Sequence, residues 1–269
     1  MLLVIGLCVG ITALIVALSM RDPKARAREA RIAKLDAAIE KSWGIIARWN
    51  RTFEQGGRAS PSTFANEYQI RRVGNLVVTS GRIAVSDLFS HAQEKPFEQA
   101  VPPGEYSVDV ALGRSATHGE RIAAARLLLS QEPAVRWEII DEEYAVESGT
   151  AAIYDVAALP PFERIASVHD GPGKNYCTDV IFPEMQKNHA AGSNWTMHRP
   201  EETHAENMAL FSTGLGDDVY DAWWGFSANG APVALITEFG LEDEPEDVIA
   251  ESPVLAANEE AFPAIKVVK

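Results

Sequence analysis

An uncharged apolar run at the N-terminal end constrains this chain more than any other feature. Residues Leu2 to Met20 read LLVIGLCVGITALIVALSM and carry no charged side chain. As an α-helix with a rise of ~1.5 Å per residue, the run would extend roughly 28 Å, close to the hydrocarbon thickness of a bilayer. We therefore expect residues 1–20 to form a transmembrane helix.

Three other interpretations of the run fit less well. A secretory signal peptide begins with basic residues, and only Met1 precedes the run. A lipoprotein signal places small residues directly before the modified cysteine, whereas Leu7 precedes Cys8. A buried core helix is rarely apolar on all sides over this length.

The charges that flank the run predict its orientation. Residues 1–35 contain two acidic residues and six basic ones, all after the run: Arg21, Lys24, Arg26, Arg28, Arg31 and Lys34. The positive-inside rule places this flank in the cytoplasm. We expect a single-pass protein of the inner (plasma) membrane with its soluble domain facing the cytoplasm.

The rest of the chain is strongly acidic. The whole sequence has 24 basic and 38 acidic residues, so residues 36–269 hold 18 basic and 36 acidic ones, a net charge of -18. Such a body is repelled by nucleic-acid phosphates, which argues against nucleic-acid binding and favours a basic protein partner or cations.

The pattern along the chain predicts a basic helical stalk and linker at 21–62, a β-rich domain at 63–241 and an acidic C-terminal extension at 242–269. The stalk carries one apolar stripe, made of Ile32, Leu35, Ile39, Ile46, Trp49 and Phe53. The stripe either forms a short coiled coil that gives a homodimer or packs on the chain's own domain, and its short length favours packing on the domain.

Strand signals fill the predicted domain and favour an α+β class with a mainly antiparallel sheet. The clearest signal is a hairpin of two apolar runs, 221–227 and 233–239, around Asn229-Gly230. We also expect strands at 75–80, 82–86 and 105–111, a strand pair formed by 122–129 with 135–140, and a paired or bulged strand at 144–154 about Gly149. Residues 170–207 show no sustained period and are expected to form a long insertion with some helix.

Several short motifs in this region resemble an uncharacterised bacterial family, the domain of unknown function 4241. They are, in order, Ser86-Asp87, Val101-Pro102-Pro103-Gly104-Glu105-Tyr106, Ala125-Arg126, Arg136-Trp137-Glu138, Ser148-Gly149-Thr150, Gly214-Leu215-Gly216-Asp217 and Trp224-Gly225. The resemblance runs roughly from Asn75 to Phe239 and implies a compact, mostly β domain. It implies no activity.

The glycine- and aspartate-containing segments are also the best candidates for a site. One hypothesis is that Asp87, Asp155 and Asp217 converge in one cleft, with Arg126, Glu138 and Tyr220 close by. Such carboxylates could hold a hard cation or act as general acid and base. The alternative is that these residues only shape turns, a role in which Gly and Asp are common.

Other site chemistries are not indicated. His189, His198, His204 and Cys177 are too widely spaced for a zinc pattern, so we predict no metal and no cofactor. Cys8 lies in the apolar run and Cys177 in the domain, so we predict no disulfide. No catalytic motif occurs in the sequence, and the preferred function is a membrane-tethered acidic protein-binding module, such as an immunity or sequestering protein. The alternative is a hydrolase or metal-dependent enzyme that uses the three Asp residues.

Overall fold

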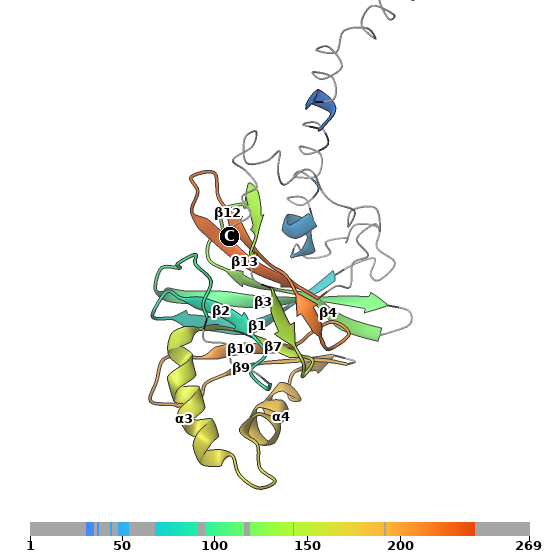
Figure 1. Cartoon of the computed structure of the whole chain (residues 1–269). Helices are drawn as coiled ribbons and strands as arrows, with labels where there is room; N and C mark the ends of the chain where they lie inside the picture. The colour runs from blue at the N-terminus through green and yellow to red at the C-terminus, as the bar shows by residue number, and fades with distance from the viewer. Residues whose placement is uncertain are drawn as a thin grey trace, which may run out of the picture.

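A computed structural model describes residues 31–34, 37, 44, 48–53, 68–90, 95–115, 119–141, 143–190 and 192–239 (Figure 1). The predicted transmembrane segment 1–20 and the acidic extension 242–269 lie outside these residues, as does most of the stalk 21–62. Within the described part of the chain, no helix is both long and apolar enough to cross a membrane.

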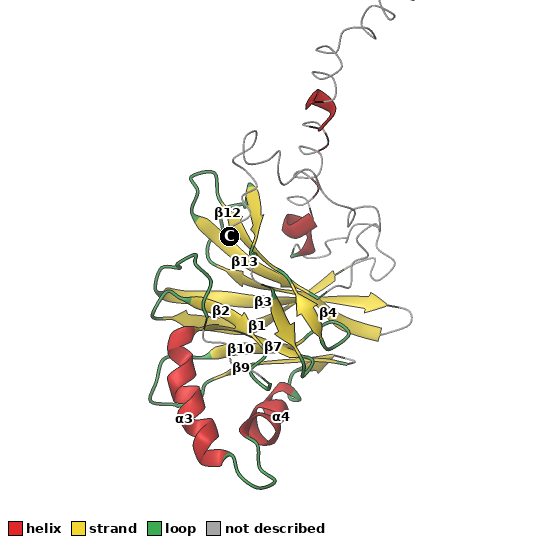
Figure 2. Cartoon of the chain, viewed as in Figure 1, coloured by secondary structure: helices red, strands yellow, loops and turns green. Residues whose placement is uncertain are grey.

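The described domain is built mainly from antiparallel sheets, which confirms the predicted β-rich class (Figure 2). The larger sheet has the order β1 (Tyr68–Val78), β3 (Gly104–Ser115), β4 (Gly119–Leu128), β13 (Pro232–Glu238), β12 (Ala222–Phe226) and β5 (Arg136–Ile139). The smaller has the order β2 (Ile83–Ser86), β7 (Thr150–Asp155), β10 (Met208–Ser212), β9 (Ser193–His198) and β8 (His189–Ala190). A separate ribbon pairs β6 (Tyr144–Val146) with β11 (Asp218–Tyr220).

The two large sheets pack face to face around the main core. The six-stranded sheet contributes Val110, Leu127 and Leu235, and the five-stranded sheet contributes Ile153 and Phe211, all of which are fully buried. Alternation along the strands directs every second side chain into this layer. The outer faces of both sheets also carry apolar side chains, and other segments of the chain pack on them.

Helices cover the outer face of the five-stranded sheet. They are α3 (Leu159–His169), with the short 3₁₀ turn Val156–Ala158 before it, and α4 (Phe182–Met185), preceded by the π-helical turn Cys177–Ile181. Their apolar side chains pack on Ala152, Tyr154 and Leu210. Strand β7 is consequently buried along its whole length, because both of its faces are covered.

The C-terminal end of the predicted stalk covers the outer face of the six-stranded sheet. Trp49 and Phe53 are 2% and 7% exposed and pack there with Trp137 and Ile236. The Trp49 ring lies 6.5 Å from the ring of Trp137 and 6.0 Å from that of Trp223. This end of the apolar stripe packs on the chain's own domain, as the second interpretation of the stalk predicts.

The hairpin predicted around Asn229-Gly230 is present as the pair β12–β13. Gly230 adopts φ +83°, which only glycine takes at little cost, and the Ser227 and Ala231 backbones are joined by a 2.9 Å hydrogen bond. The strands predicted at 75–80, 82–86 and 105–111 also correspond to β1, β2 and β3.

Two predictions about strand pairing are wrong, and a third, about the segment 170–207, is incomplete. Strand β4 pairs with β3 and β13, and β5 pairs with β12, because the C-terminal hairpin inserts between the two strands expected to be partners. The segment 144–154 is neither one strand nor a strand pair, since the turn at Gly149 sends β6 and β7 to different sheets. The segment 170–207 contains the expected helix, α4, but it also contributes the internal strand β9.

Packing of the stalk on the domain can be tested by truncating its anchor. Trp49→Ala should lower the free energy of unfolding by about 3–5 kcal/mol, because it removes a buried indole from a three-tryptophan contact. Ile32→Ala is the matched control, since Ile32 belongs to the same stripe but is 46% exposed, and it should change stability by less than ~0.5 kcal/mol. Denaturant unfolding followed by circular dichroism measures both variants. Equal effects of the two changes would show that residues 48–53 are not docked.

Candidate functional site

Asp87 organises a turn. Its carboxylate is 1% exposed and lies directly after β2. Oδ1 accepts hydrogen bonds from the backbone N–H groups of Phe89 and Ser90 and from the Ser148 hydroxyl, at 2.8, 3.2 and 2.7 Å. Oδ2 accepts from the backbone N–H groups of Glu147 and Ser148, at 2.9 and 2.8 Å. Five donors thus engage both oxygens of the carboxylate.

Asp155 has an equivalent role at the end of β7. It is fully buried, and Oδ2 accepts from the successive backbone N–H groups of Thr79, Ser80 and Gly81 at 2.8–3.0 Å. Oδ1 accepts from the Ser80 hydroxyl and from the Ala157 backbone at 2.9 Å. This carboxylate, too, is fully engaged inside the protein.

The predicted convergence of the three Asp residues does not occur. In the antiparallel β2–β7 pair, Asp155 lies opposite Ile83 while Ser86, which precedes Asp87, lies opposite Ala152. Asp87 and Asp155 therefore stand at opposite ends of the pair, ~13 Å apart at ~3.3 Å per residue. Asp217 is exposed and lies near the Asp87 end. A side chain at position 149 would place its Cβ 3.8 Å from Asp217 Oδ1.

Arg126 lies elsewhere, on the outer face of the six-stranded sheet, where its register partner is Ile236. Glu138 lies on the other face of that sheet, opposite Trp224 of the main core. Arg126 Nη2 donates to Asp109 Oδ2 at 2.9 Å, and Arg72 Nε donates to the other oxygen of the same carboxylate at 2.5 Å. Glu138 forms an ion pair with Arg136, whose guanidinium lies 4.2 Å from the centroid of the Phe226 ring. Neither predicted residue approaches Asp87 or Asp155 through a contact in the described residues.

Tyr220 is the one predicted partner that lies beside a predicted aspartate. Its hydroxyl donates a 2.6 Å hydrogen bond to the carbonyl of Gly216, the residue before Asp217. Burial raises the pKa of Tyr220, and the charges of Asp218 and Asp217 add to the shift. The phenol therefore stays protonated at neutral pH and braces the turn that carries Asp217.

The β6–β11 ribbon collects acidic residues around a small apolar centre. The register pairs Val219 with Ala145, and both are exposed while Tyr144, Val146 and Tyr220 point inward. Acidic residues stand directly before and after both strands: Glu143 and Glu147 flank β6, and Asp217 and Asp221 flank β11. The exposed Val219 and Ala145 thus lie between acidic residues along both strands.

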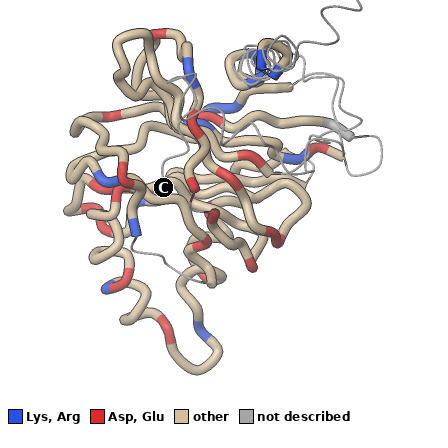
Figure 3. The backbone as a smooth tube through the Cα atoms, turned by 45° about the horizontal axis from the view of Figure 1, so that its top comes forward, with Lys and Arg blue, Asp and Glu red and all other residues tan. Residues whose placement is uncertain are grey.

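The centre of the ribbon leaves apolar surface in water. Val219 exposes 53% of its surface. Leu215, in the turn before β11, is 60% exposed. Figure 3 shows acidic positions spread widely over the domain. The ribbon combines this charge with exposed apolar side chains, which is the composition of a binding surface.

Sequence reasoning considered Asp217 and Tyr220 but missed the ribbon. The signal was a repeated pattern, acid–x–apolar–x–acid, in 143–147 and again in 217–221. The two copies lie about 70 residues apart, and only their antiparallel pairing makes one surface of them.

A buried polar chain ties the helical cover to β9. Tyr176 hydroxyl and His198 Nε2 lie 2.9 Å apart, and His198 Nδ1 lies 2.8 Å from Glu184 Oε2. Burial raises the pKa of Tyr176, with a further contribution from Glu184. Burial also raises the pKa of the Cys177 thiol, to about 12, so this free cysteine is not an activated nucleophile.

The described residues include no group of three or more His, Cys, Asp or Glu side chains placed to hold a metal ion. Cys8, the second cysteine, lies outside them.

Comparison with known proteins gives one match. A family model described as protein of unknown function (DUF4241) matches residues 76–237. No curated protein and no solved structure matches the chain. The matched range covers almost all of the two sheets and every sequence motif discussed above.

The contrasting roles of the aspartates can be tested by single amide substitutions. Asp155→Asn should lower the free energy of unfolding by about 2–4 kcal/mol, because it places an amide NH₂ against backbone N–H donors in a fully buried site. Asp217→Asn should leave stability unchanged or slightly raised, since the side chain is exposed and the change removes one charge from an acidic segment. Thermal unfolding measures both. A larger loss for Asp217→Asn than for Asp155→Asn would contradict the assigned roles.

Proposed function

Because the chain belongs to the DUF4241 family, whose description assigns no activity, we propose a function from the geometry: the domain is a protein-binding module that captures a basic partner on the β6–β11 ribbon. The observation that carries the proposal is the exposed Val219–Ala145 pair, in two paired strands that acidic residues precede and follow. A partner with Lys or Arg side chains around a small apolar contact complements this face in charge and in hydrophobicity.

The state of the other acidic candidates also favours binding over catalysis. Asp87 and Asp155 have their carboxylate oxygens occupied by backbone amides and hydroxyls, as expected of groups that fix a fold. Tyr220 is held as a protonated donor to a backbone carbonyl. Carboxylates that act on a substrate need at least one accessible oxygen, which the buried Asp87 and Asp155 do not offer.

The proposed function includes a location at the membrane. We propose that residues 1–20 span the inner membrane and that the basic flank from Arg21 to Lys34 keeps the domain on the cytoplasmic side. Tethering raises the effective concentration of the module for any partner that works at that face. An immunity or sequestering role against a basic protein fits this arrangement.

Site-specific photo-crosslinking in cells tests the binding surface. A photoreactive amino acid at Val219 should give a covalent adduct with a basic protein. The yield of this adduct should fall when Glu147→Gln and Asp217→Asn are added. The control position is Val168, which is 82% exposed and belongs to α3 on the outer face of the five-stranded sheet. An adduct of equal yield at both positions, or one that is insensitive to the two charge changes, would refute the ribbon as the capture surface.

Reporter fusions test the location. A reporter that is active only in the cytoplasm should function when it is fused after Lys269, and one that is active only outside should not. Deleting residues 1–20 should release the protein from the membrane fraction. Replacing the six basic residues of the flank by Gln should reduce the orientation bias, because the bias depends on Lys and Arg near the end of the span. Outward activity of the unaltered chain would overturn the cytoplasmic assignment.

A further inference from the structure

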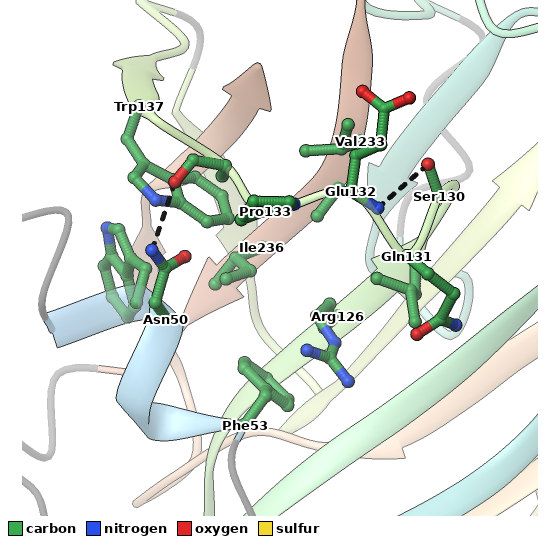
Figure 4. Close-up of a pocket in the computed structure, with 14 residues that line it drawn as sticks. Asn50, Phe53, Arg126, Ser130, Gln131, Glu132, Pro133, Trp137, Val233 and Ile236 are labelled. Carbon is green, nitrogen blue, oxygen red and sulfur yellow. Dashed lines mark hydrogen bonds between the residues drawn. The ribbon is translucent and has the colours of Figure 1, made fainter. Parts of the chain in front are cut away.

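A cavity of about 380 Å³ opens on the outer face of the six-stranded sheet, away from the ribbon residues (Figure 4). The helical segment 48–53 forms one wall and the β4–β5 connection, residues 129–135, forms another. Its volume falls in the range of natural small-molecule pockets, ~300–1,000 Å³, at the small end.

Much of the lining is apolar and buried. Phe53, Trp137, Val233 and Ile236 are all less than 9% exposed. In Figure 4, Ile236 lies between Trp137 on one side and Arg126 on the other. A ligand that fills the space would therefore place an apolar body against an aromatic and aliphatic surface.

The cavity is also lined by Arg126, whose Nε–H donor has no partner among the described residues. The Arg126 side chain is 19% exposed, and its Cζ lies 4.5 Å from the centroid of the Phe53 ring. Nη2 is bound to Asp109, but the buried Nε–H has no hydrogen-bond partner in the described part of the chain. A buried donor without a partner is costly, more so when it is charged.

The carboxylate beside Arg126 is already shared. Asp109 accepts from both Arg72 and Arg126, and the Arg72 side chain is 57% exposed whereas that of Arg126 is 19% exposed. Burial lowers the pKa of Arg126, because the charged form loses water, yet a guanidinium remains protonated at neutral pH. An anion near Nε would give this guanidinium the acceptor that its Nε–H lacks.

A second donor stands at the other end of the cavity. Trp137 is 3% exposed, and its indole Nε1–H also has no partner among the described residues. Asn50 lies beside this ring in Figure 4 and donates its own amide N–H to the Ala134 carbonyl at 3.1 Å. The Glu132 carboxylate at the rim points away from Arg126. The buried groups that lack partners in the cavity are thus donors, which select a ligand rich in acceptors.

We propose that this cavity binds a small amphipathic anion, a carboxylate carried on a short aromatic or aliphatic body. The carboxylate accepts from Arg126 Nε, and the body packs against Phe53, Ile236 and Trp137. The site does not depend on the ribbon or on its protein partner, since the two share no residue.

The probes are phenylacetate, its neutral isostere phenylacetamide, and acetate, added to the full chain in a nonionic detergent. Phenylacetate should raise the melting temperature and change the tryptophan fluorescence, because Trp49 and Trp137 line the cavity. Phenylacetamide and acetate should bind at least about tenfold more weakly, since one lacks the charge and the other the apolar body. Equal binding of the acid and the amide would overturn the proposal.

A matched pair of variants separates the cavity from the ion-pair network. Arg126→Gln and Arg72→Gln each remove one guanidinium from Asp109, but only Arg126 lines the cavity. Phenylacetate binding should fall at least about tenfold in Arg126→Gln and persist in Arg72→Gln. If the Arg126→Gln protein does not fold, Ala134→Leu tests the site instead. This change narrows the cavity and leaves Arg126 in place, so phenylacetate binding should also fall. Loss of binding in Arg72→Gln, or retention in Arg126→Gln or Ala134→Leu, refutes the site.

Discussion

The pairing of the edge strand β2 with β7 depends on a reciprocal arrangement of two buried carboxylates. Asp87 follows β2 and binds the backbone amides that precede β7, while Asp155 ends β7 and binds the backbone amides that precede β2. Each carboxylate thus fixes the chain at the entrance to the partner strand, so the pair is held at both ends. Ten hydrogen bonds to two buried anions make this register difficult to shift, because any slip would leave a desolvated charge without donors.

The exposed ribbon follows from one end of that arrangement. Asp87 holds Glu147 and Ser148 at the start of the turn to β7, and Gly149 in that turn adopts φ +65°. The Gly149 carbonyl accepts from the Thr213 backbone at 3.0 Å, which brings the turn before β11 alongside. The motif segments of the family, Ser86-Asp87, Ser148-Gly149-Thr150 and Gly214-Leu215-Gly216-Asp217, therefore meet in space, and β6 and β11 project from their meeting point.

Sequence patterns predict the strands and turns whose contacts lie close in sequence. They do not predict which distant strands pair with one another. The Asn229-Gly230 hairpin was readable because its turn and both strands lie within 20 residues. The pairing of β4 with β13 was not, since about 100 residues separate the two strands. The aspartates were recognised as important, but nothing local shows that Asp155 faces three consecutive amides at 79–81 rather than a cleft. The alternative in which Asp residues only shape turns holds for Asp87 and Asp155, and the exposed Asp217 differs from both.

The net negative charge of the domain favours binding at one proposed site and opposes binding at the other. At the ribbon, the net charge of the domain and the local carboxylates act in the same direction, so attraction of a basic partner begins at a distance and is screened by salt. At the cavity, the same net charge repels an anion at a distance, and only the desolvated guanidinium of Arg126 attracts it at short range. Burial protects that contact from screening, so salt weakens capture at the ribbon while it eases the approach of an anion to the cavity. The separation of the two sites on different sheet elements is what allows one domain to meet both demands.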